Sequence, residues 1–451
     1  IGRENDQFTG SFDGQHHTIT GLSINRPYGQ NDVGLFGNAN ANISNVGLVG
    51  VAISGGNGTY GVGGLVGYNY GQIRNSYVTG SVMGDSNVGG LVGFNNYGSI
   101  SNSYSTANVT GTGDDIGGLV GDSEGGYFSH TYATGNVSGS ASVGGLIGEN
   151  ENGRVLNSYA TGNVTGTDYG TGGLVGYNYD GSSITNSYAN GNVTGADYGA
   201  GGLVGYNEDS TISNSYASGN VDGVNEVGGL VGRNDADGWI YNSFYDIETV
   251  QINGATFIDE GGILTVGGLY SAQYADWIGN NKTLNPAEAN SDGLIEISNL
   301  QDFKNMLGFS QNENLSFIQT ANIDLTNDVG LFIPYFAGQL NGNGYSISNA
   351  TIDVDINSNI GLFGDLRGSL QGVTALNIEV SGNQNVGGLV GRVASNATIV
   401  DSVVSGAIEG INANVGGLVG FNNGLINNVT AEGSVSASAN VGGLVGTNYG
   451  S

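Results

Sequence analysis

A six-residue motif, a pair of glycines inside an apolar frame, recurs along most of this chain. The first copy, VGGLVG, spans residues 62–67, and nine further copies begin at residues 88, 116, 143, 171, 200, 227, 386, 415 and 441. Within each block of copies, neighbouring motifs lie 26–29 residues apart. A fixed period of this length indicates a solenoid, a propeller or an array in which each repeat contacts mainly its neighbours. The repeat therefore predicts a long, thin core in place of several globular domains.

The composition is that of an ordered chain rich in strands. Glycine accounts for 86 of 451 residues, but the glycines hold fixed positions among Leu, Val, Ile and Tyr, which excludes a disordered low-complexity chain. The three prolines lie outside the repeats, as expected where strands need their backbone N–H donors. Glycine and β-branched residues alternate through each repeat, so we expect strands there and not helices.

One repeat indicates which side chains face inward. The repeat that starts at Ile184 continues with Asn186 and Ser187. Tyr188 follows, and Val193 comes five residues after it. Because a valine replaces the serine in the last repeat, we place that position inside and the tyrosine outside. Period-two alternation then puts the residue after the tyrosine and the later valine inside, and leaves Tyr, Thr, Asn and Thr facing outward.

These positions predict an all-β fold, a parallel β-helix or β-solenoid, with about one three-strand coil per 26–29-residue repeat. Successive coils would stack about 4.8 Å apart through parallel hydrogen-bond ladders, with like side chains above one another. The asparagines suit left-handed turns and ladders of their own kind. The leucine of each motif would fill the core. A propeller or a leucine-rich repeat fits the spacing less well.

A second, longer repeat divides the chain. Residues 8–24 recur as residues 336–352, and each copy precedes a block of glycine motifs. We therefore expect a first array at 1–245 (opening module 1–32, repeats 33–245) and a second array at 336–451 (opening module 336–359, repeats 360–451). The connector at 246–335 should carry a short helix near 299–307, because Ser298 and Gln301 resemble a capping box. Both ends of the chain lie inside recognisable units, so we expect it to be part of a longer protein.

Charge and cysteine content exclude several classes of partner. The formal net charge of −30, with nine basic residues, argues against nucleic acid and anionic membrane surfaces. No apolar run reaches the roughly 18 residues of a membrane-spanning helix, so direct membrane insertion is not expected. The chain has no cysteine, which excludes disulfides and thiolate metal sites.

The repeat resembles a known family. The G-L-x-G core of VGGLVG, the Tyr/Phe-Asn pair that follows it and the string NSYATGNVTG are similar to the GLUG-motif repeats of bacterial surface and secreted proteins. The resemblance covers roughly residues 33–245 and 360–451. It implies a non-enzymatic structural or adhesive β-solenoid, extracellular or on the cell surface, that acts as a stiff spacer and contact surface. It brings no catalytic residue and no cofactor.

Acidic pairs are the candidates for catalysis or metal binding. They are Asp114 with Asp115, Asp122 with Glu124, and Asp235 with Asp237. All lie in expected loops and none recurs from coil to coil, so we expect no enzymatic activity. The first and third pairs also offer oxygen ligands and leave calcium open, although neither run completes an EF-hand loop.

A histidine pair near the start of the chain has a simpler interpretation. His16 and His17 adjoin Asp13, but Tyr345 replaces His17 in the second copy of the module. We therefore expect a structural turn there in place of a site.

The outward rows are the candidate binding surface. The tyrosine row comprises Tyr77, Tyr104, Tyr132, Tyr159, Tyr188 and Tyr216. The polar rows comprise Thr106, Asn108, Thr110, Thr134, Asn136, Thr161, Asn163 and Thr165. Tyrosine rings could stack on glycans or on another surface protein, and the Thr/Asn rows resemble the faces of ice-binding proteins. The alternatives are a self-packed tyrosine row and the ordinary β-propensity of threonine.

Self-association is the remaining expectation. An array that stops within a repeat leaves strand edges that another copy could pair with. A subunit of a head-to-tail extracellular filament is therefore the alternative to a spacer.

Overall fold

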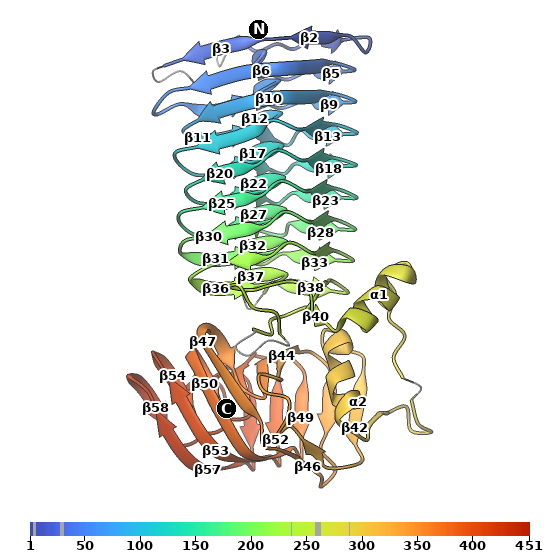
Figure 1. The fold of residues 1–451 in the computed structure, drawn as a ribbon, viewed down its shortest axis with the longest axis vertical. Coiled ribbons are helices and arrows are strands. Elements are labelled where there is room, and N and C mark those ends of the chain that lie inside the picture. The colour runs from blue at the N-terminus through green and yellow to red at the C-terminus, as the bar shows by residue number, and fades with distance from the viewer. Residues whose placement is uncertain (3–5, 28–30, 236, 258–262, 288) are drawn as a thin grey trace. The chain divides into compact units, whose positions relative to one another are not determined.

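In the computed structural model, the described residues are 1–2, 6–27, 31–235, 237–257, 263–287 and 289–451. The chain forms two compact units: unit 1 comprises residues 1–245 and 250–254, and unit 2 comprises residues 246–249 and 255–451. Each unit consists of parallel strands stacked coil on coil (Figure 1), which confirms the predicted β-solenoid.

A coil of unit 1 has four sides. In one coil they are β12 (Val92–Asn96), β13 (Ser99–Ser101), the pair β14 (Tyr104–Ser105) and β15 (Asn108–Gly111), and β16 (Ile116–Gly117). Equivalent strands pair into sheets that run from β4 (Phe36–Ala39) to β37 (Val231–Asn234), from β1 (Ser11–Asp13) to β38 (Trp239–Tyr241) and from β7 (Tyr60–Gly63) to β36 (Asn225–Gly228). The fourth sheet holds β14, β15 and their equivalents, together with the longer strands β6 (Gly47–Gly55) and β10 (Tyr77–Gly84).

The glycine motif forms a corner that separates two strands. Each coil of unit 1 therefore has four sides, where three strands were expected. β16 ends at the first glycine of its motif, and β17 (Val120–Glu124) begins after the leucine. A Cβ on Gly118, the second glycine, would lie 2.1 Å from the carbonyl oxygen of Gly145 in the next coil. The corner therefore needs glycine because successive backbones approach too closely for any side chain.

The motif leucines form the central column of the core. Leu91, Leu119 and Leu146 are all fully buried. The backbone N–H of Leu91 donates to the carbonyl of Leu119 at 2.9 Å, and that of Leu119 donates to Leu146 at 2.8 Å. Equivalent leucines therefore stack on one another, as the repeat predicts, and each coil covers the apolar surface of its neighbour.

The two asparagine positions have different roles. The asparagine after the leading apolar residue adopts left-handed backbone geometry, with φ of 48° at Asn75 and 50° at Asn157. The asparagine after the glycine motif is buried and forms an interior ladder, in which Asn150 Nδ2 donates to Asn178 Oδ1 at 2.9 Å. The sequence predicted both features for asparagine but did not divide them between the two positions. Ser123 interrupts the ladder, and Asn150 Oδ1 is left buried without a hydrogen-bond partner among the described residues.

Unit 2 has three sides and longer strands. Its sheets run from β41 (Ile295–Ile297) to β56 (Leu425–Asn427) and from β44 (Ile333–Phe336) to β59 (Val445–Asn448). The third sheet includes β47 (Thr351–Ile360), β50 (Thr374–Gly387), β53 (Val403–Gly410), β57 (Thr430–Ser436) and β58 (Ala439–Gly442). β50 runs through a position at which the strands of unit 1 break, so two sides merge into one.

The second solenoid begins inside the segment that we expected to be a connector. β42 (Ser316–Gln319) pairs in parallel with β45 (Gln339–Asn341), and β43 (Ile323–Asp324) pairs with β46 (Ser346–Ser348). These strands lack the glycine motif, and their pairing partners lie in the opening module. The period of the motif therefore could not reveal them.

Helices occur only in unit 2 among the described residues. The predicted helix is α2 (Leu300–Asn305), continued by the 3₁₀ turn η1 (Met306–Phe309), and it packs against β41 and β43. Its cap lies one residue later than expected: Asn299 accepts from the N–H of Asp302, and Asp302 accepts in return from the N–H of Ser298 at 2.9 Å. A second helix, α1 (Ser271–Gly279), was not predicted, and it buries Trp277.

Candidate functional site

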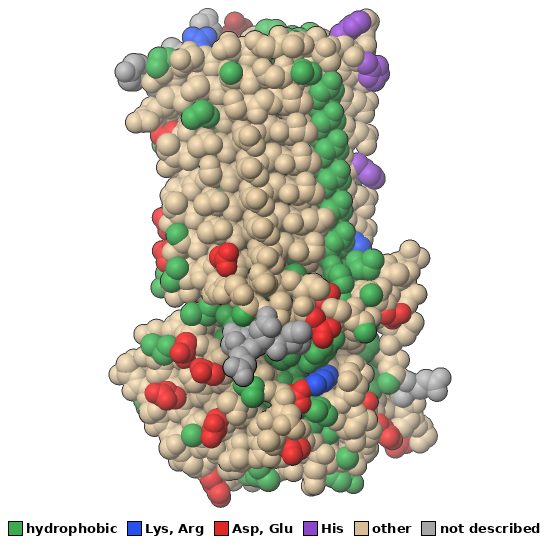
Figure 2. Space-filling model, in the orientation of Figure 1, with side chains coloured by type: hydrophobic (Ala, Val, Ile, Leu, Met, Phe, Trp, Pro, Cys, Tyr) green, Lys and Arg blue, Asp and Glu red, His purple; other side chains and the backbone are tan. Residues whose placement is uncertain are grey.

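The tyrosines of unit 1 form one continuous stack. The stack comprises Tyr77, Tyr104, Tyr132, Tyr159, Tyr188 and Tyr216. Neighbouring ring centroids lie 4.6–4.9 Å apart and the ring planes are within 6° of parallel. Figure 2 shows an unbroken stripe of hydrophobic side chains along this unit. The parallel register places each ring on the next, because Tyr104 pairs directly with Tyr132 and Tyr132 with Tyr159.

This stacking determines what the row can present. Each inner ring has a neighbour on both faces, and the outer face of Tyr77 covers Gly47, where a Cβ would lie 2.4 Å from the ring. The rings are half-buried, and burial raises the pKa of Tyr104 and Tyr132. The row therefore offers ring edges and protonated hydroxyls, and its ring faces already stack on one another.

The polar rows form a broad face along the strands β15, β20 (Val137–Gly139), β25 (Val164–Gly166) and β30 (Val193–Gly195) and the residues just before them. All eight residues of the predicted Thr and Asn rows are exposed. Figure 2 shows a face of unit 1 with few charged side chains. In a chain of net charge −30, such a surface suits an uncharged partner.

The asparagine row is held rigidly by the backbone. Asn108 Oδ1 accepts from the N–H of Asn136, and Asn136 Oδ1 accepts from the N–H of Asn163, both at 3.0 Å. Asn163 repeats the contact with Asn192. The Nδ2 groups of these three residues make no hydrogen bond within the described chain, so each coil presents one free amide donor between two threonine rows.

The polar face deepens toward its last coils into a hollow of about 310 Å³. Its polar lining consists of Asn163, Thr165, Asn192, Thr194, Asn220, Asp222 and Gln251. Amides and hydroxyls both donate and accept, which is the pairing that a sugar hydroxyl or ordered water requires.

A cluster of carboxylates lies on another side of unit 1. It contains Asp115, Asp122 and Glu124 of the predicted acidic pairs, together with Glu149 and Glu151, which the sequence analysis did not name. The register pairs Asp122 with Glu149 and Glu124 with Glu151 on β17 and β22 (Ile147–Glu151). Burial, with Glu149 and Asp122 beside it, raises the pKa of Asp115 to about 9. Burial and Glu149 also raise the pKa of Asp122 well above its usual range. Alignment of the repeats could have predicted this contact, because Asp122 and Glu149 both directly follow a glycine motif and so take the same place in neighbouring coils.

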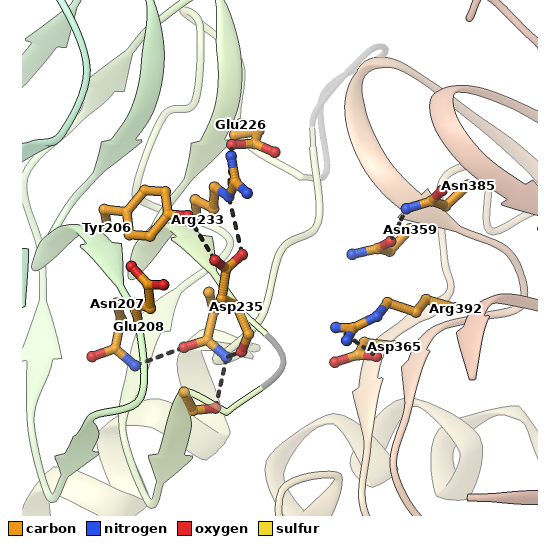
Figure 3. A network of polar contacts seen from close by, with 12 residues as sticks. Tyr206, Asn207, Glu208, Glu226, Arg233, Asp235, Asn359, Asp365, Asn385 and Arg392 are labelled. Atoms are coloured by element: carbon orange, nitrogen blue, oxygen red, sulfur yellow. Dashed lines mark hydrogen bonds and ion pairs between the residues drawn. The ribbon is translucent and has the colours of Figure 1, made fainter. Parts of the chain in front are cut away.

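The predicted calcium ligands are not brought together. Asp114 and Asp237 are exposed, and Asp115 belongs to the carboxylate cluster. Asp235 accepts from the Tyr206 hydroxyl at 2.6 Å and from Arg233 Nε at 3.1 Å (Figure 3). Within the described part of the chain, no three His, Asp or Glu side chains are arranged to hold a metal ion.

The histidine pair lies in a turn. Gln15 and His16 have left-handed φ values of 50° and 63°, and both histidines are exposed. Asp13 Oδ1 accepts from the N–H of Gln15 at 2.9 Å, which closes the turn.

Comparison with protein families finds the GLUG motif at residues 58–83, 84–110, 139–165, 167–194 and 196–222. The chain carries GLUG repeats. The five matched copies all lie in unit 1, and four of the other five motif copies also have a buried leucine, for example Leu389 and Leu418.

Two known proteins are similar to parts of this chain. Halomucin of Haloquadratum walsbyi is 36% identical over 143 residues, a match that covers 28% of this chain and 2% of Halomucin. A solved structure from Bacteroides ovatus, described as a candidate immunoglobulin A1 protease, matches with a TM-score of 0.30 and 19% identity over 62% of this chain and 75% of that one. The chain thus spans only a small fraction of the curated relative.

The position after the GLUG motif carries different charges in unit 2. There Asp365 pairs in register with Arg392, and Arg392 Nη1 lies 3.7 Å from Asp365 Oδ1 (Figure 3). Arg367 Nε lies 3.2 Å from the other oxygen of Asp365. In this column, unit 2 therefore pairs an acidic residue with an arginine, whereas unit 1 pairs two acidic residues, Asp122 and Glu149.

Neither α1 nor α2, nor any other helix of the described residues, has the length and hydropathy needed to cross a bilayer.

Proposed function

We propose that this chain is a non-enzymatic GLUG-repeat solenoid of a large surface or extracellular protein, where it acts as a stiff spacer that presents contact faces. The observation that carries the proposal is the unbroken parallel register of nine strands from β1 to β38. Eight steps of about 4.8 Å make this sheet roughly 38 Å long, and each further coil would lengthen it equally. The GLUG repeats and the segment similar to Halomucin support the same role.

Single-molecule stretching of the chain between rigid handles tests the spacer role. A solenoid whose coils are tied by ladders should resist extension and then give way in steps of whole coils, each about 28 residues. Smooth extension at low force would contradict the proposal.

Assembly with another copy is the second candidate. Each coil pairs with the next through parallel ladders, so a coil of another copy could add to the stack in the same register. Light scattering at micromolar concentration and electron micrographs decide this point: filaments require end-to-end stacking, and monomers support the spacer alone.

The contact face that we favour is the Thr/Asn face of unit 1, with a neutral glycan as partner. Its free Asn amides and the 310 Å³ hollow support this assignment. A glycan array tests it, with Asn192→Asp as the variant that places a charge in the hollow and Asn377→Asp as the matched control in unit 2. Thermal hysteresis without glycan binding would instead indicate an ice-binding face.

A further inference from the structure

Unit 2 contains a cavity that none of the roles above uses. It has a volume of about 320 Å³ and lies among α1, β41, α2, η1 and β42. This volume falls within the range of small-molecule sites, roughly 300–1,000 Å³. It is lined by the helical segment that interrupts the solenoid, where the repeat places no constraint on the side chains.

The floor of the cavity is apolar. Ile295 and Ile297 line it from β41, Met306 from η1 and Phe317 from β42, and all four are buried. Such a floor gains free energy by covering an aryl or alkyl group.

The rim is acidic. Asp276, Glu296 and Asp302 contribute carboxylates, and no lysine, arginine or histidine is among the lining residues that the structure describes. Among the described residues, each carboxylate accepts hydrogen bonds on one oxygen only: Asp276 Oδ1 from Asn280, Glu296 Oε1 from Asn290, and Asp302 Oδ2 from Ser298. The second oxygen of each is free to accept from a ligand.

A buried acceptor in the wall is unsatisfied. Gln273 Oε1 is inaccessible to solvent and has no hydrogen-bond partner among the described residues, while its Nε2 donates to the carbonyl of Asn305 at 3.5 Å. Because water does not reach this oxygen, a ligand in the cavity does not reach it either, and the acceptors open to a ligand are the rim carboxylates.

We propose that this cavity binds a small organic ammonium compound with an aryl or alkyl body. The apolar body lies on the floor, and the ammonium group donates to the free carboxylate oxygens of the rim. An anionic ligand is disfavoured by the three carboxylates and by the net charge of −30. A neutral hydroxyl in the same place would donate one hydrogen bond to the rim but would lack the attraction between opposite charges.

Calorimetric titration of the full chain with 2-phenylethylammonium chloride tests the proposal, with 2-phenylethanol and phenylacetate as probes of equal body and different charge. The amine should bind in the millimolar range or tighter, the alcohol about five- to ten-fold more weakly, and phenylacetate not detectably. Equal binding of amine and alcohol, stronger binding of phenylacetate, or no binding of the amine at about 10 mM would each overturn it.

Variants place the binding in the cavity. Asp276→Asn and Glu296→Gln together should weaken amine binding by about ten-fold and leave alcohol binding unchanged. Glu313→Gln together with Glu409→Gln, an equal charge change at two exposed residues outside the cavity, should have no effect. Loss of amine binding in this control variant would show a diffuse charge effect and overturn the assignment. The thermal melting curve of each variant controls for folding, and Met306→Trp, which fills the floor, should abolish binding of both amine and alcohol.

Discussion

Units 1 and 2 stack the same glycine-leucine corner, but they differ in their outward-facing side chains and in the length of their strands. In unit 1, short strands carry a tyrosine stack through six coils. In unit 2, Val403 and Thr430 take the tyrosine position, and the long strands β50 and β53 run on without a break. Inside each stack the leucine column is fully buried, as at Leu146 and Leu389. The corner therefore defines the coil, and the outward columns can change without loss of the fold.

Charge shows the same contrast. The column after the motif contains the like-charge pair Asp122 and Glu149 in unit 1 and the ion pair of Asp365 with Arg392 in unit 2. Like charges directly opposite each other on adjacent strands destabilise a ladder, whereas opposite charges stabilise it. The charges in the same column should therefore destabilise the ladder in unit 1 and stabilise it in unit 2.

The largest effect should come from the part that the units share. Leu146→Ala and Leu389→Ala each remove a fully buried side chain, so each should lower the free energy of unfolding by about 2–5 kcal/mol. Denaturant unfolding followed by hydrogen exchange in the adjacent coils measures both. Leu444→Ala, at a leucine that is 39% exposed, serves as the control with a much smaller loss. Clearly unequal losses at Leu146 and Leu389 would show that the two interiors are not equivalent.

The tyrosine column should separate the units. Tyr159→Ala removes two stacking contacts, and at about 0.5–1.5 kcal/mol each the loss should be about 1–3 kcal/mol in addition to the loss of burial. Val403→Ala, at the matching position of unit 2, should cost about 1 kcal/mol. Tyr159→Phe keeps the stack and should be nearly neutral in the same unfolding measurement. A loss for Tyr159→Ala no larger than that for Val403→Ala would mean that the stack is passive.

Acid should stabilise unit 1 relative to unit 2. The pKa of Asp115 is raised to about 9 in the folded chain, and that of Asp122 is also raised. The folded state therefore binds protons at a higher pH than the unfolded state, and unit 1 gains stability as the pH falls from about 9 to about 4. Below the unfolded pKa of about 4 this gain is complete.

Two other carboxylates, one in each unit, contribute to stability with the opposite pH dependence. Hydrogen bonds from Asn45 and Thr326 lower the pKa of Asp13 and of Asp324, respectively, so their contribution is present above the unfolded pKa and is lost in stronger acid. Hydrogen exchange of residues 115–150 and 386–420 between pH 8 and pH 4.5 compares the units. Asp122→Asn should flatten the response of unit 1, and an unchanged slope would contradict the assignment to this cluster.

The smallest effect is expected on the polar face. Thr134 is exposed and its hydroxyl has no role in the ladders, so Thr134→Ala should change the free energy of unfolding by less than about 0.5 kcal/mol. Asn136 accepts from the backbone of the next coil, so Asn136→Ala should cost about 1 kcal/mol. Equal effects on the melting temperature would show that the asparagine row adds nothing to stability and leave binding as its only role.

The sequence by itself determined the coil. A motif repeated every 26–29 residues, with glycine, leucine, asparagine and tyrosine at fixed offsets, specified which residues face inward and which stack. That inference works because each coil contacts its neighbours in register, so a local pattern becomes a three-dimensional one. The Asn75 turn, the Leu119 column and the exposure of Asn108 could all be read in this way.

Only the tertiary structure decided which non-repeating residues meet. Asp115 and Glu149 are far apart in the chain and became neighbours through the width of one coil, and the start of the second solenoid at β41 depends on pairing without a motif. Whether the tyrosine faces were free depended on the distance between coils, and the cavity among α1, β41 and η1 depended on packing. Side-chain contacts between segments of unlike sequence leave no periodic pattern in the sequence. The repeat therefore predicted the fold, whereas the sites became known only from the structure.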